Sequence, residues 1–158
     1  MAPNKVKKLA TTASQASGPN WIHLDQQLCF ALYSASLAMT KQYKPLLDPL
    51  GLTYPQYLVM LVLWETSPIS VNEVGKRLSL DSGTLTPLLK RLEASALISR
   101  QRDAEDERRV LVSVTPKGQE MKQKAQSVPQ AIACQVGIGL DDIATLRSTL
   151  QKLKEQIR

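Results

Sequence analysis

Hydrophobic side chains recur every three or four residues along most of this chain, which is the spacing of helices that bury one face. Two such runs follow one another between residues 70 and 95: Val71, Val74 and Leu78, and then Leu85, Leu88, Leu89 and Leu92. The residues between these runs leave room only for a turn. Two helices joined by so short a turn must cross sharply, so the pattern predicts a helix-turn-helix.

Polar residues mark where these two helices begin. Ser70 is followed three residues later by Glu73, which is the spacing of a capping box, so we expect the first helix to begin close to Ser70. For the second helix we take Thr84 as the cap. Pro87 then falls in the first turn, where its missing N–H has no partner to lose.

Two short segments after the second helix alternate apolar with polar or charged residues. They are residues 97–102 and 109–114, and this alternation is typical of half-buried strands. The connection between them reads DAEDER, which is too charged to pack and should project as a loop. A helix-turn-helix followed by a charged hairpin is a winged helix.

Two helices are predicted before this region. Residues 24–47 form a long amphipathic helix in the prediction. Thr53 with Gln56 then offers a second capping box, for a helix that runs through Glu65.

Two more helices are predicted after the wing. Thr115 followed by Pro116 is a favourable helix start. This helix is expected to run to about Ala133, with a bend or a break near Pro129. Residues 140–157 carry the apolar face of the last helix.

The segments 22–65 and 115–158 carry more apolar surface than the winged helix region, residues 66–114, needs for its own core. This surplus predicts a dimer interface. The expected fold is mainly α with a small β wing (α+β), a winged helix-turn-helix with N- and C-terminal dimerisation helices. With 158 residues, of which 43% are hydrophobic, we expect one domain at 21–158 behind a flexible tail at 1–20.

The net charge of +6 fits a polyanionic partner. Residues 70–115 nevertheless carry eight basic and seven acidic side chains, so affinity for DNA must come from their placement. The basic side chains that could line a phosphate-facing surface are Lys76, Arg77, Lys90, Arg91, Arg100 and Arg102.

The composition also argues against several classes of protein. No apolar run approaches the ~20 residues of a membrane-spanning helix, and the N-terminus lacks the apolar segment of a secretory signal. We therefore expect a cytoplasmic protein with no membrane partner. Its two cysteines should be reduced. They lie far apart and His23 is the only histidine, so we expect no metal site and no cofactor.

One face of the predicted helix 24–47 carries reactive and hydrogen-bonding groups: Cys29, Tyr33, Ser36, Thr40 and Tyr43. A cysteine reacts as its thiolate, and nearby donors such as phenol hydroxyls lower the pKa of a cysteine. Cys29 and Tyr43 are 14 residues apart, or roughly 21 Å along one helix at ~1.5 Å per residue, so they cannot touch within a chain. They could meet if two copies of the helix cross antiparallel near Ser36.

The order of helices around a central wing resembles the MarR family of transcription regulators over about residues 22–158. The stretch DERRVLVSVTPKG is similar to the family's wing signature, an Asp, any residue and an Arg, then a strand that ends in Thr-Pro. LCFALYSASLAMTKQYKPLL, GLTYPQYLVMLVLWE and LDSGTLTPLLKRLEAS closely resemble the organic hydroperoxide resistance regulators (OhrR).

The resemblance implies a dimeric repressor that leaves DNA when an organic hydroperoxide oxidises its N-terminal cysteine. By motif, that sensor is Cys29, and Tyr43 and Tyr54 match the tyrosines that support its sulfur. Tyr33 matches a further tyrosine near this pocket. Cys134 resembles the resolving thiol of the two-cysteine subgroup, which bonds to the sensor of the other subunit. Such a disulfide would protect a sulfenic acid from irreversible oxidation.

In this fold the second helix of the helix-turn-helix should enter the major groove with its N-terminal turn closest to the bases. Ser82, Thr84 and Thr86 are candidates for base or phosphate contacts, and Lys90 and Arg91 for phosphate contacts or simple exposure to solvent. The resemblance implies that the wing residue Arg108 inserts into a minor groove and that Asp106 orients it. A dimer should read a pseudo-palindromic operator.

Other hypotheses remain open at this point. Cys29 and Cys134 are small hydrophobes in the simplest interpretation, and the tyrosines are core aromatics. Cys29 could instead turn over as a thiol peroxidase, although we expect no enzyme activity. An architectural DNA protein would bind DNA without sequence preference. Within the family, the alternative is a repressor released by a small phenolic or aromatic ligand.

Overall fold

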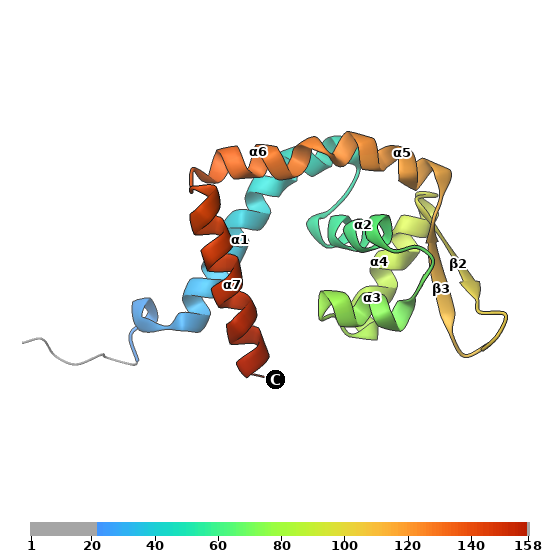
Figure 1. Ribbon diagram of the computed structural model, residues 1–158, viewed down its shortest axis with the longest axis horizontal. Helices are drawn as coiled ribbons and strands as arrows, with labels where there is room; N and C mark the ends of the chain where they lie inside the picture. Colours follow the sequence, from blue (N-terminus) through green and yellow to red (C-terminus); the bar gives the residue numbers. More distant parts are fainter. Residues whose placement is uncertain (1–21, 158) are drawn as a thin grey trace, which may run out of the picture. The chain divides into compact units, whose positions relative to one another are not determined.

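The computed structural model describes residues 22–157, except for the side chain of Leu140 (Figure 1). These residues fall into two compact units, with the boundary between Leu37 and Ala38. The tail predicted at residues 1–20 lies outside the described residues. The single domain predicted for residues 21–158 stays a prediction.

The first unit contains a short 3-10 helix, Leu24–Gln26, and the first half of α1 (Leu28–Leu47). The prediction of one continuous helix from residue 24 is wrong at its start. Gln27 has an extended backbone, with φ −86° and ψ 116°, and its N–H donates to the carbonyl of Leu24 at 3.0 Å. This bond closes the first turn, so the α-helix begins separately at Leu28.

The second unit begins with the rest of α1, followed by a 3-10 helix, Asp48–Leu50, and by α2 (Tyr54–Glu65). The capping box predicted at the start of α2 is present, because the N–H of Thr53 donates to Oε1 of Gln56 at 2.8 Å and the Thr53 side chain pairs with the first turn. The predicted end of this helix at Glu65 is confirmed.

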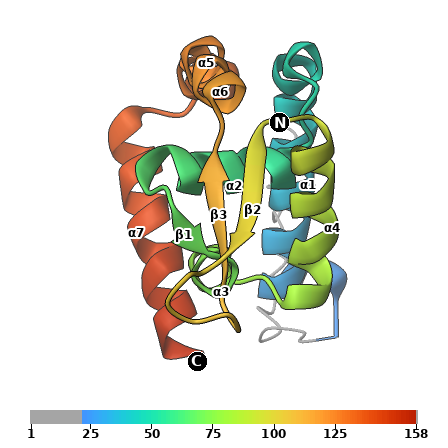
Figure 2. The ribbon, with the colours of Figure 1, turned by 90° about the vertical axis from the view of Figure 1, so that its right-hand side faces the viewer.

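The predicted winged helix-turn-helix is present in this unit. Its elements are β1 (Ile69–Ser70), α3 (Val71–Leu78), α4 (Ser82–Ala94), β2 (Ile98–Arg102) and β3 (Val110–Val114). β3 lies between β1 and β2 in an antiparallel sheet (Figure 2). The register places Ser70 opposite Leu111, and Arg100 opposite Val112. β1 was not predicted, because two residues are too few to show alternation.

One hydrophobic core holds the helix-turn-helix against the sheet. Its fully buried side chains come from the predicted helical stripes and from β3, and they include Leu63, Val74, Leu85, Leu89, Leu92 and Val112. Burial of a leucine side chain stabilises a fold by about 1.5–3 kcal/mol. Three buried leucines therefore fix which face of α4 points inward, and the polar face of α4 is left to solvent.

The cap of α4 is Asp81, so the predicted cap at Thr84 is wrong. The Asp81 carboxylate accepts the N–H of Thr84 at 2.9 Å, and the helix begins at Ser82. Pro87 consequently lies inside the helix and cannot donate to the carbonyl of Gly83. The Pro87 ring is exposed, so its steric crowding of the preceding turn occurs on the solvent side of α4. By beginning at Ser82, the helix gains an aspartate cap and nearly one more turn.

Beyond the wing lie α5 (Pro116–Ala125), α6 (Ser127–Val136) and α7 (Leu140–Gln156). The predicted start of α5 is confirmed, since the N–H of Gly118 donates to the hydroxyl of Thr115 at 3.0 Å. The predicted break near Pro129 falls at Gln126, between α5 and α6, because the proline has no N–H for the carbonyl of the residue four positions earlier.

No single helix in the part of the chain that the structure describes is long and apolar enough to cross a membrane. Only the helices of residues 28–50 and 54–65, taken together as a bent pair, reach the necessary length and composition.

Candidate nucleic-acid interface and thiol site

The first turns of α4 present short polar side chains whose hydroxyl hydrogens are already engaged. Thr84 donates its hydroxyl to the Asp81 carboxylate at 2.9 Å, and Thr86 donates its hydroxyl to the carbonyl of Ser82 at 2.6 Å. The hydroxyl oxygens can still accept hydrogen bonds, and the threonine methyl groups are available for apolar contact. Thr84 and Ser82 are exposed, and Thr86 is half-buried.

Asp81 organises this turn as a charged cap. The hydrogen bonds from the backbone N–H and the hydroxyl of Thr84 lower the pKa of its carboxyl group. An ionised carboxylate at a helix N-terminus is also favoured by the helix dipole. The start of α4 is therefore fixed in one geometry before any ligand binds.

The basic side chains near α4 differ in how they are held. Lys90 and Arg91 are exposed, and neither forms an ion pair with another of the described residues. Arg77 pairs with Glu65, and Arg100 donates to Glu93 from Nε at 3.0 Å and from a terminal nitrogen at 2.5 Å. Lys90 and Arg91 therefore have no competing carboxylate among the described residues, and the same is true of the exposed Arg102 on β2.

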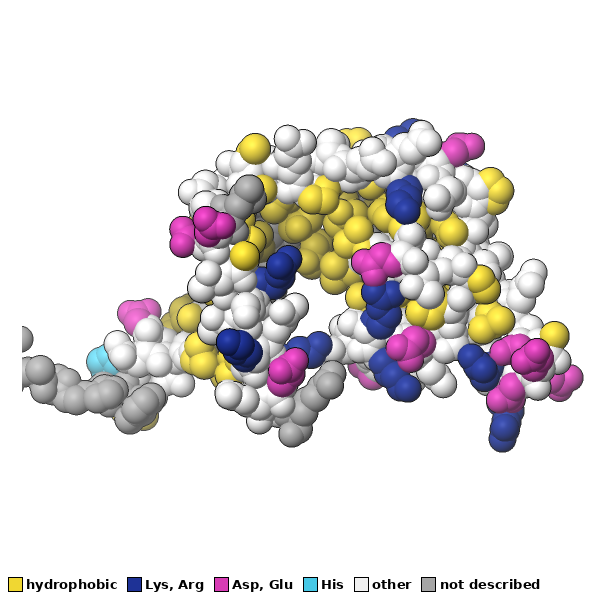
Figure 3. Space-filling model, viewed as in Figure 1, with side chains coloured by type: hydrophobic (Ala, Val, Ile, Leu, Met, Phe, Trp, Pro, Cys, Tyr) yellow, Lys and Arg dark blue, Asp and Glu magenta, His cyan; other side chains and the backbone are white. Residues whose placement is uncertain are grey.

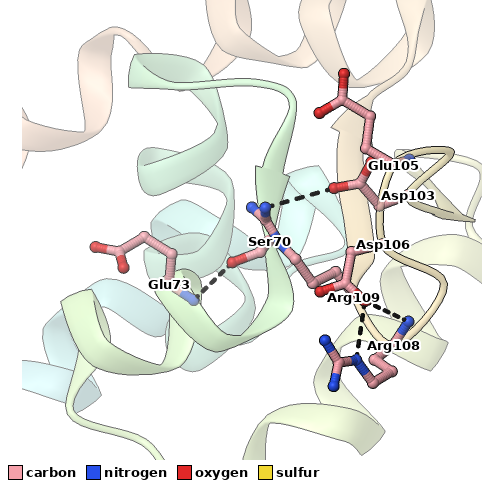
Figure 4. A network of polar contacts seen from close by, with 7 residues as sticks. All are labelled: Ser70, Glu73, Asp103, Glu105, Asp106, Arg108 and Arg109. Atoms are coloured by element: carbon pink, nitrogen blue, oxygen red, sulfur yellow. Dashed lines mark hydrogen bonds and ion pairs between the residues drawn. The ribbon is translucent and has the colours of Figure 1, made fainter.

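Arg108 at the tip of the wing is held by its neighbour Asp106. Oδ1 of Asp106 accepts both the backbone N–H and the Nε–H of Arg108, each at 3.1 Å (Figure 4). These bonds lower the pKa of the Asp106 carboxyl group. The Arg108 side chain is 91% exposed, so its outer guanidinium nitrogens remain available.

A second aspartate shapes the same loop. Asp103 accepts the N–H of Glu105 at 3.1 Å and lies 3.6 Å from a guanidinium nitrogen of Arg109. Backbone bonds close the loop, from Asp103 N–H to the carbonyl of Arg109 and from Arg109 N–H to the carbonyl of Asp106, at 2.9 and 2.8 Å. Acidic and basic side chains therefore lie next to one another at the wing (Figure 3). The sequence pattern predicted only a charged loop here, without the role of Asp103.

Both cysteines carry free thiols, and both are exposed. Cys29 lies in the first turn of α1, in the first unit. Cys134 lies near the end of α6, in the second unit, shortly before Gly137 ends the helix with φ 66°. The interpretation of either residue as a small buried hydrophobe does not fit this exposure.

The rings of Tyr43 in α1 and Tyr54 in α2 are in tilted contact, with centroids 4.6 Å apart and an interplanar angle of 46°. Burial raises the pKa of both phenols, and the neighbouring Tyr54 raises that of Tyr43 further. Both hydroxyls thus keep their protons at neutral pH and can act as hydrogen-bond donors. Tyr57 extends the cluster, 6.0 Å from Tyr43, and sequence analysis missed it although it follows Tyr54 by the helical spacing of three.

The structure thus brings together some of the predicted site residues and leaves others untested. It pairs Tyr43 with Tyr54, and Asp106 with Arg108. Cys29 and the exposed Tyr33 belong to the first unit, so their predicted proximity to Tyr43 and Tyr54 remains a prediction. Across residues 22–157, no group of histidine, cysteine and acidic side chains is arranged to hold a metal ion.

Comparisons with known proteins agree with this geometry. A family model described as the transcriptional regulator SarA/Rot matches residues 41–125. The organic hydroperoxide resistance transcriptional regulator of Bacillus subtilis (strain 168) is 51% identical over 134 residues, which cover 85% of this chain and 91% of that protein.

Solved structures of the regulator AbfR from Staphylococcus epidermidis are also similar. Reduced AbfR bound to DNA is 38% identical, with a TM-score of 0.70, over 85% of this chain and 95% of that one. Disulfide-formed AbfR is 38% identical, with a TM-score of 0.60, over 82% and 91% of the two chains. The similarity covers both the winged helix and the helices around it.

Proposed function

Because the chain belongs to the organic hydroperoxide resistance regulators, within the MarR/SarA-type transcriptional regulators, we propose that it is a dimeric repressor that releases operator DNA when an organic hydroperoxide oxidises Cys29. It would act in the cytoplasm as a sensor that reacts once per signal, without enzymatic turnover. The observation that carries the proposal is the exposed, unbonded thiol of Cys29 in the first turn of α1.

The first chemical step is an exchange of electrons between sulfur and peroxide. The Cys29 thiolate attacks one peroxide oxygen, the O–O bond breaks, and the alkoxide leaves and takes up a proton to become an alcohol. The sulfur is oxidised to a sulfenic acid and the peroxide is reduced. The protonated phenols of Tyr43 and Tyr54 are suited to donate hydrogen bonds to the thiolate, if a second copy of α1 brings its Cys29 to them.

The second step makes the oxidation of Cys29 reversible and couples it to a movement of helices. The partner subunit's Cys134 attacks the sulfenic sulfur, an S–S bond forms and water leaves. A disulfide requires α-carbons within about 7 Å, so α1 and the partner's α6 must move together if they begin further apart. The exposure of Cys134 and the left-handed Gly137 beyond it support such a movement.

DNA binding rests on the exposed groups of α4 and the wing. We propose that Ser82, Thr84 and Thr86 face the bases of a major groove, with Lys90 and Arg91 on the flanking phosphates. Arg108, held by Asp106, would enter the adjacent minor groove. Two copies related by a two-fold axis would read a pseudo-palindromic operator.

The test is DNA binding measured by fluorescence anisotropy on the duplex upstream of the protein's own gene, with and without cumene hydroperoxide. Wild type should lose the duplex on oxidation and recover it with dithiothreitol. Cys29→Ser should remain bound, and Cys134→Ser should respond in an altered or irreversible way. Wild type that remains bound after hydroperoxide, or Cys29→Ser that is released, would overturn the sensing mechanism.

One observation favours a second candidate, a repressor released by an aromatic ligand. A cavity of about 320 Å³ lies between α2 and the junction of α5 with α6, and its lining includes Tyr57, Leu61, Trp64 and Lys122. Its apolar walls suit an aromatic ring, and its lining carries one ammonium group, that of Lys122, and one carboxylate, that of Glu65. Release of Cys29→Ser from DNA by salicylate under reducing conditions would support this candidate over thiol oxidation.

A further inference from the structure

A second cavity lies at the junction of the helix-turn-helix with the wing. It has a volume of about 220 Å³ and is formed by the start of α3, the middle of α4 and the base of the wing. Its polar lining consists of Ser70, Asn72, Thr86, Arg100, Arg108 and Arg109. Three arginines thus contribute to the lining of one hollow, and none of the described residues that line it is acidic.

Each of these arginines is tethered by one carboxylate outside the lining. Arg100 is held by Glu93, Arg108 by Asp106 and Arg109 by Asp103. A guanidinium has five N–H donors, and each carboxylate engages only one or two of them. The acids therefore fix the positions of the side chains and leave donors for a further acceptor.

Arg109 is the arginine best placed to face such an acceptor. It reaches from the wing toward Ser70 at the start of α3, while Asp103 holds one of its nitrogens (Figure 4). Its side chain is 54% exposed, whereas the side chain of Asp103 is only 13% exposed. An anion that enters the hollow would meet the guanidinium and would be kept from its acidic partner.

The start of α3 adds donors of its own. The Ser70 hydroxyl accepts the N–H of Glu73 at 3.2 Å, so its own hydrogen is available to an anion. The helix dipole places positive partial charge at the same end, and the first turn of a helix leaves N–H groups without partners inside the helix. The side-chain amide of Asn72 is a further donor at the rim.

We propose that this cavity binds one phosphodiester group of the DNA backbone, with Arg109 and Ser70 as its main ligands. The proposal rests on the proposed DNA-binding function of α4 and Arg108. One sugar-phosphate strand separates the major groove, which α4 would fill, from the adjacent minor groove, which Arg108 would enter. That strand must pass between α4 and the wing, and the cavity lies there.

The test uses the salt dependence of DNA binding by the full chain. For each phosphate contact that is lost, the slope of log K against log salt should fall by about 1. Arg109→Gln should show this loss, and it should weaken binding to the upstream duplex and to an unrelated duplex by the same factor, because a phosphate carries no sequence information. Arg109→Lys should keep most of the slope, because it keeps the charge.

Arg147→Gln is the matched control, since it removes the same charge from an exposed position on α7. Its slope should equal that of wild type. An unchanged slope for Arg109→Gln, or an equal loss for Arg147→Gln, would overturn the proposal. A further arm titrates inorganic phosphate into the protein without DNA. If phosphate binds to wild type and not to Arg109→Gln while the DNA slope stays unchanged, the hollow serves a free phosphate and the DNA assignment is wrong.

Failure of this site and failure of redox sensing give different results. Arg109→Gln retains Cys29, so the duplex that it still binds should be released by cumene hydroperoxide as in wild type. Suppose that wild type stays on DNA after hydroperoxide treatment, and that Arg109→Gln shows the reduced slope of log K against log salt. This result would refute the sensing mechanism and would still support the phosphate site. Wild type that binds no duplex would overturn both.

Discussion

Gly118, in the first turn of α5, faces the carbonyl oxygen of Leu97 so closely that a β-carbon at residue 118 would overlap it. The same carbonyl accepts the N–H of Thr115 at 3.1 Å, and the Thr115 hydroxyl donates to the carbonyl of Ala96 at 2.7 Å. The indole N–H of Trp64 donates to the carbonyl of Gly118 at 2.9 Å. Hydrogen bonds and close packing therefore hold the start of α5 against the turn that follows α4, and against α2.

Gly118→Ala should destabilise the protein, because backbone on both sides must shift to admit the methyl group. Overpacking of this kind costs about 1–3 kcal/mol. Urea denaturation measures the change in the free energy of unfolding. Gly139→Ala is the control, since a β-carbon there would only approach Asp142 at 3.4 Å, and its effect should be near zero. Equal stabilities for the two variants would contradict the close packing at residue 118.

Because the cap of α4 is the carboxylate of Asp81, the free energy of unfolding should depend on pH in the acidic range. The pKa of Asp81 is lowered in the fold from its ordinary value of 3.8, mainly by hydrogen bonds from Thr84. A lowered pKa gives a contribution that is present above the unfolded value and lost as the pH falls through the folded value. Asp81→Ala should therefore destabilise the protein at pH 7, and the difference from wild type should shrink at pH 3.

Asp81→Asn provides the matched comparison for this prediction, because asparagine caps a helix without titrating. The gap in stability between Asp81→Asn and Asp81→Ala should be the same at pH 7 and at pH 3. If the gap between wild type and Asp81→Ala is likewise independent of pH, the carboxylate is not the group that responds to acid.

Local sequence patterns were sufficient to predict the helix-turn-helix, the wing strands and the caps at Thr53, Ser70 and Thr115. Hydrophobic spacing specifies the helices and strands, and polar residues at short, fixed spacings mark the caps. The start of α4 was missed because two local rules conflict there. A proline favours the first turn, but the stronger cap at Asp81 places Pro87 inside the helix.

The candidate site was less predictable because its contacts depend on how elements pack. The ring contact between Tyr43 and Tyr54 joins two helices, and the cavity beside Arg109 joins α3, α4 and the wing. No spacing rule along the chain predicts which side chains of different elements become neighbours. The pairing of Asp103 with Arg109 across the wing loop was equally unpredictable, because a run of charged residues indicates only exposure to solvent until its backbone turns are known.

Tyr54→Phe should slow the oxidation of Cys29, because it removes a protonated phenol and keeps the ring that contacts Tyr43. A hydrogen-bond donor aimed at the sulfur would stabilise the attacking thiolate, and this variant lacks that donor. The rate of release from DNA after cumene hydroperoxide is the measurement, and a decrease of about tenfold corresponds to about 1.4 kcal/mol in the barrier. Tyr57→Phe removes the hydroxyl of the neighbouring buried tyrosine and serves as control. Equal release rates for the two variants would show that the Tyr54 hydroxyl has no specific role in the oxidation of Cys29.

Two acids of the wing loop should affect DNA binding with opposite signs. Glu105→Gln removes a negative charge from an exposed side chain, so it should strengthen binding slightly at low salt through reduced repulsion of phosphate. Asp106→Asn removes the same charge, but it also weakens the charge-assisted hydrogen bonds that hold Arg108 at 3.1 Å. If Asp106 positions Arg108 for the minor groove, Asp106→Asn should weaken operator binding several-fold while binding to an unrelated duplex is kept or improved. Stronger operator binding by both variants, measured by anisotropy at one fixed salt concentration, would show that Asp106 acts only as a charge.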